Sequence, residues 1–149
     1  MNTSSGRLIA IARHARSHGD LEELETIDIS AESGLSGDFR GASPGRQISI
    51  LSQTSWDAAC AALGETLPWT VRRANLLVDG LDLQDSIGAV IRIGKVALKI
   101  TEECKPCSRM EAARPGLRAA LGPDWRGGVL AVVLNGGQIS RNDLITLEV

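Results

Sequence analysis

The chain has 149 residues, of which 43% are hydrophobic and 23% are charged, with 16 glycines and 5 prolines. This is typical of one globular domain, residues 1–149, that buries a core without metals or disulfides. The formal net charge of −2 argues against a general nucleic-acid binder, which normally presents a strongly basic face. No apolar segment is long enough to span a membrane, and the N-terminal apolar run is too short for a signal peptide. We therefore expect a cytoplasmic protein with no membrane or nucleic-acid partner.

Short apolar segments dominate the sequence and predict strands. RLIAIAR at residues 7–13 has no polar position between its ends, and RQISIL at 46–51 alternates between polar and apolar residues. AVIRIGKVALKITE at 89–102 predicts a β-hairpin, because Gly94 and Lys95 form a two-residue turn with glycine first, as a type II′ turn requires. GGVLAVVLNGG at 127–137 predicts a buried strand between glycine pairs, and DLITLEV predicts a closing strand.

The first predicted helix is TSWDAACAALG at residues 54–64. Thr54 and Asp57 have the spacing of a capping box, and Gly64 is a typical helix end. Cys60 falls on the apolar face, so we expect it in the core, where free cysteine packs as a small hydrophobic residue.

A second short helix is predicted at residues 114–122, with Pro115 at its start and Gly122 at its end. Together with the strands, these helices indicate a mainly β fold, a barrel with a few short helices at its rims.

Cys104 and Cys107 have the most informative spacing in the chain, on the loop that leaves the hairpin's second strand. Ser108 and Glu111 have capping-box spacing and predict a short helix, with Cys107 just before its N-cap. Backbone N–H groups and the helix dipole favour a thiolate there. Cys107 is therefore the better candidate for a nucleophile or a soft-metal ligand, and the alternative is a pair of inert surface thiols.

Two other interpretations of the cysteine pair have weaker support. His14 and His18 have H-x3-H spacing and would complete a Cys2His2 zinc set, but they lie some 90 residues from the cysteines. A thioredoxin-like redox pair needs a βαβ fold, whereas a β-hairpin precedes this one.

Arginine makes up 13 of the 16 basic residues, and guanidinium groups suit phosphate and planar polar heterocycles. Those in glycine-rich or strand-edge segments are Arg40, Arg46, Arg72, Arg73 and Arg126. The segment GLSGDFRG at 34–41 predicts a tight loop that presents Asp38.

Several segments in this order resemble the MOSC domain, named for the C-terminal part of molybdenum cofactor sulfurases. They are GLSGDFRG, GRQISIL, RRANLLVDGLDLQDSIGAVIRIGKVALKITEECKPC and WRGGVLAVVLNGGQISRNDLITL, which together extend from about Gly34 to Leu147. The resemblance implies a closed, mostly antiparallel β-barrel with a pocket at one end. It also implies that Cys107 carries sulfur as a persulfide or ligates molybdenum.

The same resemblance suggests cofactor-binding residues. Arg73 and Asn75 match the family's Arg/Asn stretch near the pocket, and we add Asp38, Arg46 and Arg126 as candidates for contacts with molybdopterin. Many relatives carry a histidine after the Gly-Asp loop, where this chain has Phe39 and Arg40.

The function that we expect is that of a stand-alone MOSC domain. It would bind molybdenum cofactor or carry sulfane sulfur on Cys107, with Cys104 resolving the persulfide or forming a protective disulfide. The chain lacks the pyridoxal-phosphate domain of full sulfurases, so a cysteine desulfurase or another donor would supply the sulfur and a molybdoenzyme would accept it. The alternatives are a non-catalytic accessory module, which would hold zinc, and a partner subunit of an N-hydroxylamine reductase.

Overall fold

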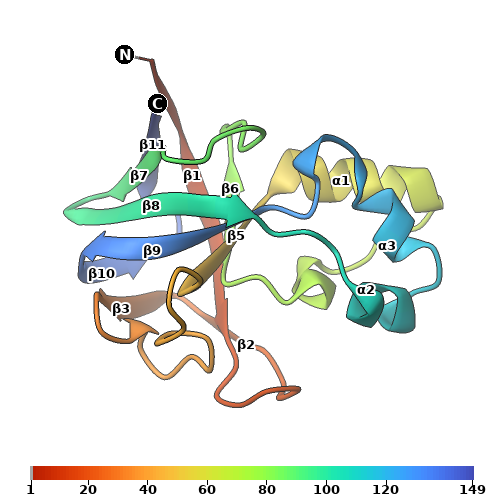
Figure 1. The fold of residues 1–149 in the computed structure, drawn as a ribbon, viewed down its shortest axis with the longest axis horizontal. Coiled ribbons are helices and arrows are strands. Elements are labelled where there is room, and N and C mark those ends of the chain that lie inside the picture. Colours follow the sequence, from red (N-terminus) through yellow and green to blue (C-terminus); the bar gives the residue numbers. More distant parts are fainter. Residues whose placement is uncertain (1) are drawn as a thin grey trace.

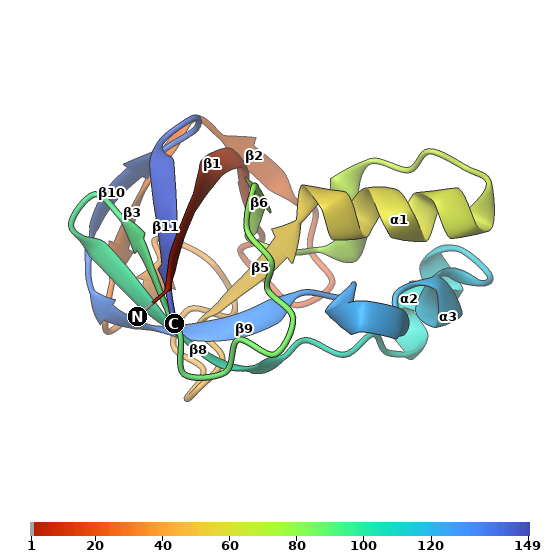
Figure 2. The ribbon, with the colours of Figure 1, turned by 90° about the horizontal axis from the view of Figure 1, so that it is seen from above.

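The computed structural model describes residues 2–149, whose strands curl into a closed barrel with the α-helices gathered on one side (Figures 1 and 2). The strands are β1 (Thr3–Arg13), β2 (Glu22–Leu24), β3 (Thr26–Ser30), β4 (Gly34–Leu35), β5 (Ile48–Ser52), β6 (Leu76–Asp79), β7 (Val90–Ile93), β8 (Val96–Glu103), β9 (Val129–Asn135), β10 (Gly137–Ser140) and β11 (Leu144–Glu148). The α-helices are α1 (Gln53–Leu63), α2 (Ser108–Ala113) and α3 (Leu117–Ala120), and the 3₁₀ helices are η1 (Trp69–Arg72) and η2 (Pro123–Trp125).

Seven strands of this described part of the chain form the barrel, in the order β11-β7-β8-β9-β5-β6-β1, and β1 closes it by pairing with β11. These pairings are antiparallel except that of β5 with β6. Strand β2 continues the sheet beside β1, while β10, β3 and β4 form a second sheet. The prediction of a mainly β, closed and mostly antiparallel barrel with a few short helices is therefore confirmed.

Strand β5 is buried on both faces because it separates two apolar cores. Ile48 and Ile50 pack in the barrel interior, whereas Leu51 packs in a second core between the barrel and the helices. This second core also holds Trp56 of α1, which is 2% exposed, and Cys60, as the sequence predicted. This second core therefore fixes the helices to the outside of the barrel wall.

The hairpin of β7 and β8 forms as predicted. Ile93 pairs with Val96 across the turn, and Gly94 takes a φ of +59°, which glycine adopts without the steric cost of a Cβ. Strand β1 is longer than predicted, because residues 3–6, which precede the predicted segment, also pair with β11 at the barrel's closure.

The starts of α1 and α3 and the N-cap residue of α2 differ from the prediction. Helix α1 begins at Gln53, since Ser52, rather than Thr54, accepts a hydrogen bond at its N-terminus from Ser55 N. Cys107 is itself the N-cap residue of α2 without a side-chain cap bond, and α3 begins only at Leu117.

None of the helices in residues 2–149 is long and apolar enough to cross a membrane.

Candidate functional site

A pocket of about 190 Å³ lies where the end of the barrel meets η1, α2 and the loop between β8 and α2. It brings together segments that are far apart in the sequence, including both cysteines of the Cys104–Cys107 pair. Its lining residues are His14, Arg40, Arg46, Ser49, Ile50, Arg72, Arg73, Ala74, Cys104, Lys105, Cys107, Arg109, Met110 and Gly127.

The lining is cationic, although the whole chain carries a formal charge of −2. Five arginines and one lysine line the pocket, and there is no Asp or Glu among the described lining residues. Charges of one sign that line a concave surface raise the local concentration of oppositely charged ligands. The arrangement therefore suits an anion.

Unpartnered polar atoms point to the same pocket. In residues 2–149, the buried side-chain nitrogen and oxygen atoms without a hydrogen-bond partner are His14 Nδ1, Arg40 Nε and Arg73 Nε, and all three residues line it. A buried polar atom without a hydrogen-bond partner destabilises a folded protein unless a bound molecule supplies the missing partner. A ligand with acceptor oxygens would do so for the two guanidinium groups.

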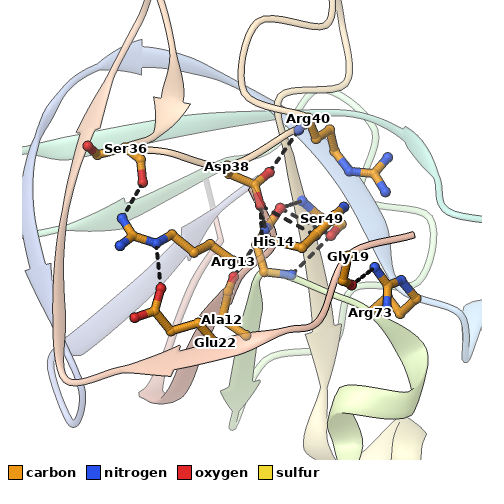
Figure 3. A network of polar contacts seen from close by, with 11 residues as sticks. Ala12, Arg13, His14, Gly19, Glu22, Ser36, Asp38, Arg40, Ser49 and Arg73 are labelled. Atoms are coloured by element: carbon orange, nitrogen blue, oxygen red, sulfur yellow. Dashed lines mark hydrogen bonds and ion pairs between the residues drawn. The ribbon is translucent and has the colours of Figure 1, made fainter. Parts of the chain in front are cut away.

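Asp38 belongs to a buried network that holds this wall in place (Figure 3). Asn75 belongs to the same network. The Asp38 carboxylate accepts hydrogen bonds from the backbone N–H groups of His14 and Arg40, both at 3.0 Å, and from Asn75 Nδ2 at 3.2 Å. Asn75 also accepts from Ser49 N at 3.0 Å. The network joins the end of β1, the loop after β4 and strand β5, so it positions three residues of the pocket lining: His14, Arg40 and Ser49.

Arg73 occupies a strained position directly after η1, with a φ of +64°. Its Nη2 donates a hydrogen bond of 2.6 Å to Gly19 O, which leaves Nε without a partner (Figure 3). Burial and the neighbouring Arg109 lower the pKa of Arg73, but arginine stays protonated in proteins. Arg73 therefore brings a fixed positive charge to the pocket.

Arg72 anchors the loop that carries Cys104. Its Nε donates to Gly127 O at 3.0 Å and its Nη2 to Cys104 O at 2.8 Å, and Nη2 also lies 3.2 Å from Cys104 Sγ. Arg72 is 8% exposed, so it fixes this contact from inside the protein.

Cys107 is exposed, whereas Cys104 is only partly so. Both line the pocket, but Cys107 has the freer access to solvent and to a partner. Arg109, two residues later in α2, also lines the pocket and donates a hydrogen bond to His18 Nδ1.

The structure brings both candidate cysteines and four of the five candidate arginines to the pocket: Cys104, Cys107, Arg40, Arg46, Arg72 and Arg73. Asn75 is 0% exposed and the Asp38 side chain is also 0% exposed, so both lie behind the pocket wall. Arg126 does not line the pocket, and its Nη1 donates to Ala120 O.

The zinc interpretation finds no ligand set in the structure. No cluster of three or more His, Cys, Asp or Glu side chains suited to a metal ion occurs within residues 2–149. His14 does line the pocket, but His18 interacts with Arg109 instead. Sequence reasoning considered His14 only as a zinc ligand and missed Ser49 altogether. The H-x3-H spacing of His14 suggests zinc rather than this pocket, and no motif marks Ser49, because the fold alone brings both residues to the pocket.

A comparison with protein-family models matches the MOSC domain over residues 37–146. This chain belongs to the MOSC domain family. Solved structures confirm the fold. The YuaD protein from Bacillus subtilis superposes with a TM-score of 0.84 at 18% identity, over 98% of this MOSC chain and 97% of its own.

YiiM proteins have the same fold. YiiM from Geobacillus stearothermophilus gives a TM-score of 0.76 at 15% identity, over 95% of this MOSC chain and 74% of its own. YiiM from Escherichia coli gives 0.73 at 17% identity, over 95% of this chain and 69% of its own. A comparison with curated proteins found no match.

Proposed function

We propose that this MOSC domain binds molybdenum cofactor in the cationic pocket and uses Cys107 as its working thiol. The observation that carries the proposal is the lining itself: six cationic side chains and two cysteines, with two buried guanidinium nitrogens that lack acceptors. The family's association with this cofactor supports the same proposal.

The residues present fit the chemistry of such a cofactor. Its phosphate is a dianionic acceptor for Arg40 and Arg73, and a thiolate such as that of Cys107 is a soft ligand for molybdenum. When bound, the cofactor supplies a redox-active metal. The pocket volume of about 190 Å³ is below the range of about 300–1,000 Å³ typical of small-molecule sites, so it would enclose one end of the ligand.

The first test measures cofactor content. The protein is produced in a host that makes molybdenum cofactor, and molybdenum and pterin are quantified per chain. We expect both to be present in the wild type and to fall at least tenfold in an Arg40→Gln, Arg73→Gln double variant, because a hydrogen bond to a charged group contributes about 1.5–3 kcal/mol. Arg118→Gln, on the exposed face of α3, is the matched control. Equal cofactor content in all three proteins, or none in any, would contradict the proposal.

Carriage of sulfane sulfur is the second use that we propose for Cys107. The Cys107 thiolate attacks the terminal sulfur of a persulfide on a donor such as a cysteine desulfurase. The donor's S–S bond breaks, its cysteine leaves as a thiolate, and a new S–S bond forms on Cys107 without net oxidation or reduction. The exposure of Cys107 suits an exchange between proteins, with a molybdoenzyme as the acceptor.

Mass spectrometry tests this step. After incubation with a cysteine desulfurase and cysteine, we expect the intact protein to gain one sulfur atom that maps to the Cys107 peptide. Cys107→Ser should abolish the gain, while the buried Cys60→Ser variant should retain it. Equal sulfur on wild type and Cys107→Ser would overturn sulfur carriage but leave cofactor binding to its own test.

A further inference from the structure

We propose that His14 takes up a proton when an anion enters the pocket, so that anion binding to this domain is coupled to proton binding. This inference rests on the proposed function, because it concerns the same pocket. It adds a residue and a pH dependence that follow from the arrangement of side chains around His14.

The geometry leaves His14 with an unused nitrogen beside an acceptor. His14 directly follows β1, is 5% exposed and lines the pocket. Its Nδ1 lies 3.5 Å from Asp38 Oδ1 but makes no hydrogen bond there. The ring also lies beside Phe39, with 6.1 Å between the ring centroids. A protonated Nδ1 would therefore face a buried carboxylate after a small shift.

The charges around the ring oppose protonation while no anion is bound. Burial, as the main cause, lowers the pKa of His14, Asp38 raises it, and Arg73, Arg40 and Arg109 lower it further. These neighbours come from the loop after β4, the end of η1 and helix α2. The other charged or titratable lining groups are Arg46, Arg72, Lys105, Cys104 and Cys107. Apart from the two thiols, every one of these groups is cationic.

An anion among the arginines reverses this balance. The anion offsets the positive charges that disfavour the imidazolium form of His14. The Asp38 carboxylate remains beside the ring, where it can accept a hydrogen bond from the protonated Nδ1. By linkage, an anion that raises the proton affinity of His14 must itself bind more tightly when His14 is protonated. Anion affinity should therefore fall as pH rises. The fall is up to tenfold per pH unit, over the range between the pKa of His14 in the free protein and its higher pKa in the anion complex.

The experiment measures sulfate binding by calorimetry between about pH 5 and about pH 8, the range in which histidine titrates. Sulfate stands for the phosphate end of the cofactor and remains a dianion throughout, so any pH dependence comes from the protein. We expect affinity for the wild type to fall at least fivefold from the acidic to the basic end. In His14→Gln, which retains the backbone N–H that binds Asp38, the dependence should be lost. His18→Gln, which removes the chain's other histidine, should retain it.

A second measurement needs no variant that alters the wall. The His14 ring titration is followed by NMR with and without saturating sulfate, and sulfate should move its midpoint to higher pH. Sulfate binding with the same pH dependence in wild type and His14→Gln, or an unmoved midpoint, would overturn the role of His14. A complete lack of sulfate binding at any pH would instead count against the anion-binding pocket itself.

Discussion

His14 makes the stability of this domain depend on pH, because a buried imidazole beside several arginines resists protonation. Burial and its cationic neighbours lower the pKa of His14 in the native state. Below about pH 6.5, where an unfolded histidine binds a proton, the unfolded chain therefore takes up more protons than the native one, and the free energy of unfolding falls.

We expect wild-type protein to lose stability between about pH 7.5 and about pH 5 in urea denaturation, and His14→Gln to lose less over that window. His18→Gln, which alters the exposed histidine, should behave like the wild type. Equal losses for wild type and His14→Gln would show that His14 is not the group responsible.

Asn75 serves the site by holding its wall. Its side chain is bonded to Ser49 N, Ala12 O and Asp38 Oδ1 at 3.0–3.2 Å in the protein interior. Asn75→Ala would leave these groups without partners, each at a cost of about 1–3 kcal/mol. We expect urea denaturation to show a loss of roughly 3 kcal/mol. Asn135→Ala, which removes one exposed bond to Lys95 O, should cost less than about 1 kcal/mol, and similar losses for both would argue against the network.

At the scale of elements, Gly127 lets the loop that enters β9 approach the Cys104 loop closely. A Cβ at position 127 would lie 2.4 Å from Cys104 O and 3.2 Å from Arg72 Nη2. Gly127→Ala must therefore displace the cysteine loop. We expect a loss of about 1–3 kcal/mol in unfolding free energy, as for overpacked sites, and a changed rate of reaction of Cys104 with a thiol reagent.

Gly122→Ala is the control for this substitution. Gly122 already has helical backbone angles, and its added Cβ would lie 3.4 Å from Ala119 O, which is an ordinary contact. It should leave both stability and thiol reactivity near wild-type values. Normal reactivity of Cys104 in Gly127→Ala would show that the loop adapts without moving the thiol.

Elements whose signals are local were predictable from the sequence, whereas those that depend on distant partners were not. The hairpin turn at Gly94 follows from the glycine's own backbone freedom, and the end of α1 at Gly64 from its left-handed φ of +68°. The start of α1 was misplaced because Ser52 at the end of β5 caps it in place of Thr54. Helix α2 begins at Ser108 as predicted, but its N-cap is Cys107, and Glu111 accepts a hydrogen bond from Gly116 N instead of closing a capping box.

The same distinction holds for the site. Spacing and family resemblance mark Cys107 and Arg73 in the sequence, and both line the pocket. Asn75 carries an equally strong motif, but the tertiary structure directs its amide into the wall. His14 reaches the pocket only because β1 runs along the barrel to that end, so its role emerges from the folded chain.

At the scale of the whole molecule, the barrel is closed by the two ends of the chain. Thr3 pairs with Glu148, and Val149 N donates to Asn2 O at 3.0 Å, so the termini lie side by side (Figure 2). A short flexible linker that joins them would cost little strain, and exposed turns tolerate new ends. Gly94 and Lys95 form such a turn, remote from the pocket lining.

We therefore expect a circular permutant opened between Gly94 and Lys95 to fold, with the circular dichroism spectrum of the linear protein and unchanged sulfate affinity. The same linker with new ends between the buried Gly127 and Gly128 should fail, because those ends would fall within the packed contact with Cys104 and the start of β9. If both permutants bound sulfate like the linear chain, the pocket would not depend on this contact. If neither folded, joining the paired ends of β1 and β11 would not suffice to preserve the barrel once the β7–β8 turn is opened, and the expectation would be wrong.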